Sequence, residues 1–187
     1  MKNKPLIVGI GGTTRAGSSS EKLVRCVLRE IETQGGETKM FGGEALAELP
    51  HFTPENSQRS AEQQQFIESI RQADGLVIGS PAYHGGVSGL VKNAIDLLED
   101  LREDTNSYFS GRAVGLVVTA AGWQACGVTL QALRGIVHAL RGWPTPLGIA
   151  VNSLDQKPFD PDGRLIDPNI KAAIKLQAEQ VMVFASK

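Results

Sequence analysis

Short apolar segments alternate with longer amphipathic segments along this chain, and this alternation restricts the fold more than any other feature. Candidate strands lie at residues 6–10, 38–41, 76–80, 114–119 and 147–151. The first, third and fourth are almost wholly apolar, which is typical of parallel strands covered on both faces. Helical patterns separate them, at residues 20–34, 57–73, 89–103, 127–141 and 168–185. The pattern predicts an α/β fold, a doubly wound five-stranded parallel sheet with helices on both faces.

The predicted sheet has one end at which a ligand is expected. With strand order 2-1-3-4-5, the carboxyl ends of strands one and three lie side by side, where the order reverses. Three loops leave the strands at this end, and small residues dominate all three: GGTTRAGSSS, SPAYHGGVSG and TAAGWQACG. Small residues let backbone N–H groups approach a ligand closely. The loops at the other end are more charged.

The composition narrows the class of protein. The 187 residues carry a net charge of −1, from 19 Lys and Arg against 20 Asp and Glu, and no basic run suggests a nucleic-acid or anionic-membrane partner. Cys26 and Cys126 lie far apart, and no His or Cys spacing predicts a metal site. The first apolar run is too short for a secretory signal, and no stretch is long enough to span a membrane. We therefore expect a cytoplasmic protein with a single domain over residues 1–187.

The first loop has the composition of a phosphate site. Its hydroxyls belong to Thr13, Thr14, Ser18, Ser19 and Ser20. The following helix is predicted to begin near Ser18, with Ser18 and Glu21 spaced for a capping box, and its N-terminus attracts anions. Arg15 adds a charge-assisted donor. An ordinary Ser/Thr-rich turn with a helix cap is the alternative, but a cap needs only one hydroxyl.

The loop does not match the two common nucleotide motifs. Ser18 stands where a Walker loop requires lysine, which disfavours ATP or GTP hydrolysis. Thr14 stands where a dinucleotide fingerprint has its third glycine. Hydroxyls and a cation suit a terminal phosphate monoester better than an internal pyrophosphate. FMN is a monoester of this kind with a large planar head group.

Two segments carry a family resemblance. The first loop resembles the GSxRxxSxN phosphate loop of the NAD(P)H-dependent FMN reductases, flavodoxin-like proteins that include quinone, azo-dye and chromate reductases. Thr13 replaces the first Ser, and Ser20 replaces the Asn. The segment SPAYHGGVSGLVKNAIDLL resembles the family's PxY followed by GxLKNAID, with His84 where Asn is frequent. The third loop matches less closely, with Cys126 where a glycine is common. The matching residues are Arg15, Ser18, Pro81, Tyr83, Leu90, Lys92, Asn93, Ala94, Asp96, Gly122 and Gly127.

The resemblance implies one flavodoxin-like FMN-binding domain that holds FMN non-covalently and uses NAD(P)H as co-substrate. In the family, residues matching Thr13, Arg15, Ser18 and Ser20 hold the phosphate. The hydroxyl-rich composition of the first loop adds Ser19 to this predicted set. Residues matching Pro81, Ala82, Tyr83 and His84 line the ribityl chain and the ring. The third loop, around Ala121, Gly122 and Trp123, borders the other side of the ring.

The implied reaction moves a hydride from NAD(P)H to bound FMN and then to free flavin, a quinone, an azo dye or another small acceptor, in a ping-pong cycle. It requires no acid, base or nucleophile from the protein, so no catalytic residue is assigned. Gly85, Gly86, Ala120 and Ala121 are the small residues that leave room for stacked rings. The resemblance also implies a homodimer or homotetramer packed through the helix after the second loop. A flavin-dependent monooxygenase is a further possible partner.

Two alternatives remain open. One is a non-catalytic flavodoxin-like electron carrier, although such carriers are usually strongly acidic. The other is a phosphate-ester-binding enzyme unrelated to flavin.

Several side chains have two readings. Tyr83 and His84 either contact the ring or stabilise their loop. Trp123 either shields the flavin or nicotinamide or anchors an interface, and both cysteines are expected to pack as small apolar residues. Lys92 and Asp96 are spaced i,i+4 in the less favourable orientation, which suggests pairing between subunits.

Overall fold

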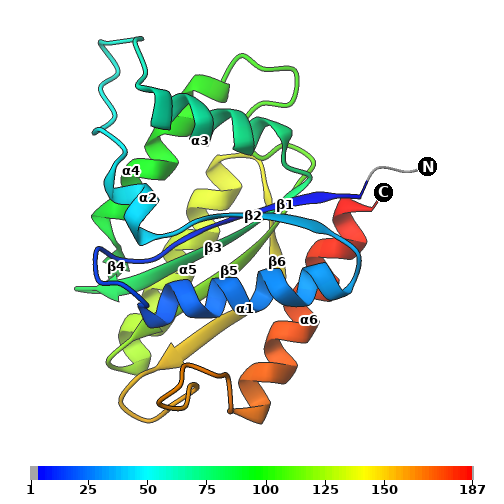
Figure 1. Cartoon of the computed structure of the whole chain (residues 1–187). Helices are drawn as coiled ribbons and strands as arrows, with labels where there is room; N and C mark the ends of the chain where they lie inside the picture. The colour runs from blue at the N-terminus through cyan, green and yellow to red at the C-terminus, as the bar shows by residue number, and fades with distance from the viewer. Residues whose placement is uncertain (1–3, 187) are drawn as a thin grey trace.

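The computed structural model describes residues 4–186 and contains the predicted parallel sheet (Figure 1). Its five long strands are β1 (Leu6–Gly11), β2 (Glu37–Phe41), β3 (Gly75–Tyr83), β5 (Ala113–Ala120) and β6 (Trp143–Asn152). They lie in the order β2-β1-β3-β5-β6, and the short β4 (Gly86–Val87) pairs antiparallel with β3. With β4 set apart, this is the predicted order, and both the α/β class and the arrangement of the sheet are confirmed.

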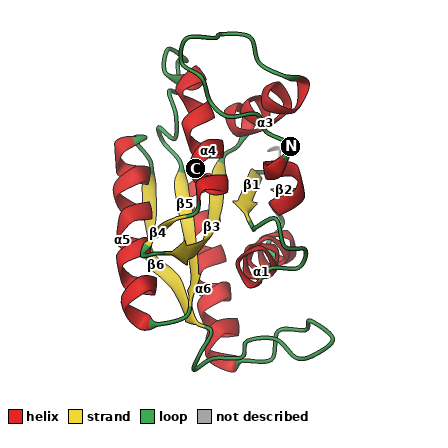
Figure 2. Ribbon diagram, turned by 90° about the vertical axis from the view of Figure 1, so that its left-hand side faces the viewer, coloured by secondary structure: helices red, strands yellow, loops and turns green. Residues whose placement is uncertain are grey.

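Helices cover both faces of the sheet (Figure 2). One face is covered by α1 (Ser19–Thr33) and α6 (Pro168–Ala185), which pack on Ile7, Val77 and Val117. The other face packs on Val8, Ile10 and Leu116. Its helices are α2 (Gly43–Ala47), α3 (Ala61–Gln72), α4 (Gly89–Asp96), the 3₁₀ helix η1 (Leu97–Leu101) and α5 (Trp123–Ala139).

Glycines in β1 and β3 bring α1 close to the sheet. A Cβ at Gly9 would lie 2.6 Å from Cδ1 of Leu28, and a Cβ at Gly79 would overlap the side chain of Val24. Both contacts are with residues of α1. The missing side chains therefore set the height of α1 over the sheet, and with it the position of its N-terminus beside the strand ends.

Several boundaries differ from the predicted ones. Helix α5 begins at Trp123 rather than 127, after Gly122 turns the chain with a φ of 131°. Strand β6 begins at Trp143 rather than 147, because an edge strand with a register shift against β5 tolerates its two prolines. Helix α3 begins at Ala61, where a capping box between Ser60 and Gln63 sets its start.

Two short elements were not predicted, and one predicted helix is divided. Helix α2 has five residues and β4 has two, and segments this short show no recognisable hydrophobic periodicity. The helix predicted at 89–103 consists of α4 followed by η1. None of the helices within residues 4–186 combines the length and the hydropathy that a membrane crossing needs.

The C-terminal region follows the prediction closely. Helix α6 begins with Asp167 as N-cap, whose carboxylate accepts from the N–H groups of Asn169 and Ile170, and with Pro168 in the first turn. The preceding surface excursion turns at Gly163, with a φ of 79°, and closes through a bridge between Phe159 and Leu165.

Candidate functional site

A cavity of about 430 Å³ lies at the carboxyl ends of β1, β3 and β5. Its volume is in the range of small-molecule sites. Four segments contribute to its walls: the loop after β1, the end of β3 with the following turn, the β5–α5 junction, and the end of β6. The lining residues are Thr13, Arg15, Ser18, Ser19, Ser20, Pro81, Ala82, Tyr83, His84, Gly85, Thr119, Ala120, Ala121, Ala125 and Ser153.

The N-terminus of α1 forms one wall, and its cap differs from the predicted one. Ser18 is the N-cap residue, but its side chain caps no N–H group in the described chain, so the predicted Ser18–Glu21 capping box is wrong. The Glu21 carboxylate is instead bound by the Gly43 N–H and by Arg25. The first-turn N–H groups thus remain available to an anion, beside the buried hydroxyls of Ser18 and Ser20, whose oxygens are 3.5 Å apart.

Arg15 provides the positive charge of this wall. The Thr13 hydroxyl accepts a hydrogen bond from the Arg15 N–H at 3.1 Å, which shapes the turn. Within residues 4–186 the Arg15 guanidinium has no ion-pair partner, and no carboxylate is among the lining residues. Free N–H groups, hydroxyls and an unpaired guanidinium together fit a phosphate monoester. Thr14 lies outside this cavity and lines another on the far side of the loop.

The second wall is a β-hairpin rather than the irregular loop that was predicted. Ala82 pairs with Val87 and Tyr83 with Gly86, and the two-residue turn between them is His84-Gly85. Both turn residues have positive φ, 54° and 76°, as in a type I′ turn. The fully buried Ser80 holds the base of the hairpin, because its hydroxyl donates to the Pro81 carbonyl and accepts from the Ser88 N–H.

The third wall is formed by the β5–α5 junction and the end of β6. Asn152 Oδ1 accepts from the N–H groups of Gly122 at 2.8 Å and Leu154 at 3.2 Å, and its Nδ2 donates to Asp155 at 2.6 Å. Ser153 donates from both its N–H and its hydroxyl to the Ala120 carbonyl. The two chain segments are therefore connected directly beside the cavity.

All but two of the predicted cofactor-binding residues line this one cavity. The exceptions are Gly122, which caps α5, and Trp123, whose indole N–H donates to Asp155 at 2.9 Å. Sequence reasoning missed Thr119, Ala125 and Ser153. The signal for Ser153 was available, because it follows the fifth strand and all parallel strands end on the same side.

The two cysteines and the pair Lys92 and Asp96, which the sequence analysis also considered, lie outside the cavity. Cys126 is buried, and burial raises the pKa of its thiol, so it packs as a small residue as predicted. Cys26 is partly buried against the α1–α6 core, and burial raises its pKa too. Lys92 and Asp96 pair with each other within α4 at 2.6 Å.

A larger cavity, of about 1070 Å³, is less suited to a phosphate ester. It lies between α3, η1 and the segment before α3 and shares no lining residue with the first cavity. Both of its arginines are already paired, Arg59 with Asp100 and Arg71 with Asp104. Within residues 4–186, no cluster of His, Cys, Asp and Glu side chains could hold a metal ion.

A model of the family described as NADPH-dependent FMN reductase matches residues 5–155. The chain belongs to this family. It is 29% identical over 186 residues to an FMN-dependent NADPH-azoreductase of Staphylococcus haemolyticus, covering 95% of this chain and 93% of the relative.

Solved structures of other proteins share this fold. An oxidoreductase from Corynebacterium diphtheriae has a TM-score of 0.72 at 16% identity, over 98% of this chain and 97% of the other. FerB, an NAD(P)H:(acceptor) oxidoreductase from Paracoccus denitrificans, has a TM-score of 0.69 at 16% identity, over the same shares. The family match makes the protein an NAD(P)H-dependent FMN oxidoreductase, with FMN as its cofactor and NAD(P)H as its co-substrate.

Proposed function

We propose that the 430 Å³ cavity is the FMN site and that the phosphate binds between Arg15 and the N-terminus of α1. The observation that carries this proposal is the convergence of three loops and the end of β6 on one cavity. Its lining includes a guanidinium with no ion-pair partner among residues 4–186 and includes no carboxylate. Thr13, Ser18, Ser19 and Ser20 would donate hydroxyl and N–H hydrogen bonds to the phosphate. The whole of residues 1–187 would serve as one FMN-binding domain.

We assign the ribityl chain and ring to the hairpin wall and the β5–α5 wall. Pro81, Ala82, Tyr83 and His84 would line one side and Ala121 the other. Gly122 would act only by shaping the turn into α5. Trp123 would support the wall from outside through Asp155.

The reaction asks the protein mainly to bind and orient. When bound, FMN accepts a hydride from NAD(P)H and passes it on, so the protein needs no nucleophile. Gly85, Ala120 and Ala121 leave space beside the walls for a second ring, which NAD(P)H and the acceptor would use in turn. We propose a small aromatic acceptor, namely free flavin, a quinone or an azo dye, and the azoreductase relative supports the last of these.

The assembly and location are proposals of the same kind. We propose a cytoplasmic homodimer or homotetramer in which α4 faces a neighbouring subunit. A flavin-dependent monooxygenase would be a further partner if reduced flavin is released.

The function is tested by anaerobic reduction. Protein loaded with FMN should lose the visible absorbance of its oxidised flavin when NADPH or NADH is added alone, and recover it on addition of a quinone or an azo dye. Initial rates at several concentrations of both substrates should give the parallel reciprocal plots of a ping-pong cycle. Flavin that stays oxidised with both nicotinamides would instead support an electron carrier.

The phosphate site is tested by Arg15→Ala. Loss of a charged hydrogen bond costs about 1.5–3 kcal/mol, so the Kd for FMN should rise at least about tenfold. Titration by flavin fluorescence measures it, and riboflavin, which lacks the phosphate, should bind both proteins almost equally. An unchanged Kd for FMN would contradict the assignment.

A further inference from the structure

We propose that Glu21 is a positioning residue that fixes the phosphate loop through Gly43. The inference rests on the proposed binding of the FMN phosphate by that loop. A carboxylate in the first turn of α1 is favoured by the positive end of the helix dipole, but it repels a dianion bound at the same helix end. Its hydrogen bonds show what else it does there.

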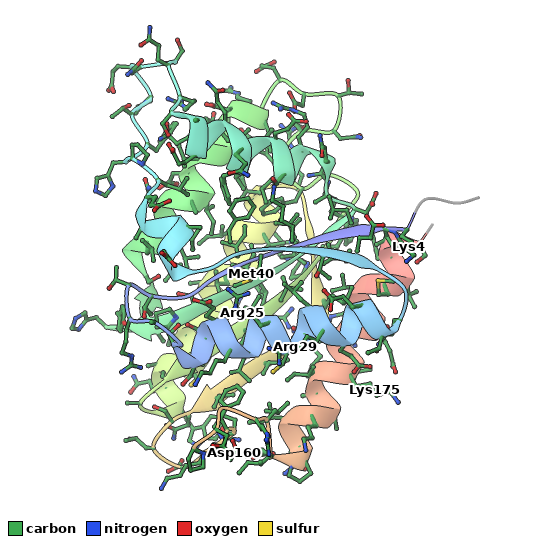
Figure 3. The ribbon with its side chains drawn as sticks, viewed as in Figure 1. Lys4, Arg25, Arg29, Met40, Asp160 and Lys175 are labelled. Atoms are coloured by element: carbon green, nitrogen blue, oxygen red, sulfur yellow. The ribbon has the colours of Figure 1, made fainter. Side chains whose placement is uncertain are left out.

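The Glu21 carboxylate joins two segments, α1 and the start of α2. Its Oε2 accepts a hydrogen bond from the Gly43 N–H at 3.0 Å, at the start of α2. Its Oε1 accepts from Nε of Arg25 at 2.9 Å and from Nη2 at 2.7 Å. Arg25 projects from α1 toward β2 and Met40 (Figure 3), and both residues line the 680 Å³ cavity beside this junction. The Glu21 side chain is only 15% exposed, whereas that of Arg25 is 45% exposed.

Glycines let the backbones meet around this carboxylate. A Cβ at Gly12 would lie 2.6 Å from the Gly43 nitrogen and 2.9 Å from Glu21 Oε2. A Cβ at Gly42 would lie 2.8 Å from Glu21 Oε1, and one at Gly43 would overlap the Thr13 carbonyl oxygen. The turn after β2 is thus packed directly against the phosphate loop, and the carboxylate bonds this turn to α1, the helix that follows the loop.

The contact leads directly to the phosphate-binding groups. Gly43 supports the Thr13 backbone, and the Thr13 hydroxyl in turn accepts from the Arg15 N–H. Losing the bond between Glu21 and Gly43 frees the β2–α2 turn, and with it the support under Thr13. We infer that Glu21 acts on FMN affinity through the position of Thr13 and Arg15, with Arg25 offsetting its charge.

A purely electrostatic role of Glu21 and a positioning role predict opposite changes in the affinity for FMN. If Glu21 acted only as a nearby negative charge, its removal would tighten FMN binding. If it positions the loop, Glu21→Ala should weaken FMN binding about tenfold and riboflavin binding less than about twofold. Glu21→Gln keeps an oxygen for the Gly43 N–H and should lie between wild type and Glu21→Ala. Glu21→Gln is close in size and shape to the wild-type residue, so it should fold even if Glu21→Ala does not.

The titrations use FMN and riboflavin on each variant, with Glu62→Ala as the matched control. Glu62 is a first-turn glutamate of α3, away from the cavity, and its removal should change neither affinity. FMN affinity that is unchanged or tighter in both Glu21 variants would overturn the inference. So would an equal loss for FMN and riboflavin, which would indicate general loosening of the fold.

Arg15→Ala separates this inference from the proposed function. If Arg15→Ala weakens FMN binding and the Glu21 variants do not, only the role of Glu21 is wrong. If Arg15→Ala has no effect either, the phosphate site itself is misplaced, and the role of Glu21 is wrong with it.

Discussion

Asn152 is the single side chain on which the third wall of the cavity most depends. It is 3% exposed, and its amide oxygen and nitrogen bond to Gly122, Leu154 and Asp155. Its own N–H donates to Gln156 Oε1. One amide side chain thus holds both the positive-φ turn before α5 and the segment that carries Ser153.

Asn152→Ala should lower the free energy of unfolding by about 1–3 kcal/mol, because it removes the three hydrogen bonds that this buried side chain makes to Gly122, Leu154 and Asp155. Urea denaturation measures the change. The matched control is Leu154→Ala on the same loop: Leu154 is 71% exposed and should change stability by no more than about 0.5 kcal/mol. Equal stability of the two variants would contradict the role of Asn152.

At the scale of elements, α3 is closed at its C-terminus by a buried arginine from another part of the chain. Arg112, just before β5, donates to the carbonyls of Ile70 and Arg71, in the last turn of α3, and to that of Tyr108. Burial lowers the pKa of its guanidinium, while the carboxylates of Asp74 and Asp104 oppose that shift. A cation at the end of a helix also offsets the negative end of its dipole.

Arg112→Met should destabilise the protein by about 3 kcal/mol, since three carbonyls lose their donor in a buried site. Urea denaturation should show a lower midpoint with an unchanged m-value. Arg102→Met removes an arginine that is 64% exposed and should have little effect. FMN affinity should stay within about twofold of wild type in both variants, because Arg112 lies at the opposite end of β5 from the cavity.

At the scale of the whole molecule, the sheet could be predicted because three of its strands, β1, β3 and β5, are nearly continuous apolar runs. The order 2-1-3-4-5 was expected for a doubly wound sheet of five strands, and the position of the site followed from the point where that order reverses. What periodicity could not detect was a five-residue helix, a two-residue strand and the extension of β6 through two prolines.

The sequence predicted which loops surround the candidate site, but not the direction in which individual side chains point. The first loop and the PAYH segment were placed correctly around one cavity, because strand ends determine where loops lie. The direction of Trp123 and the partner of Glu21 depend on residues distant in the chain, Asp155 and Gly43. A local rule such as the capping box misses such partners, because it considers only four consecutive residues.

The two ends of the sheet are built from separate sets of residues. Arg112 and the C-terminus of α3 lie at one rim, and every lining residue of the cavity lies at the other. Substitutions that stabilise the first rim against heat should therefore leave the proposed FMN site at the second rim unchanged. Conversely, substitutions at the tip of the β3–β4 hairpin could be selected for new acceptors without lowering the thermal stability of the protein.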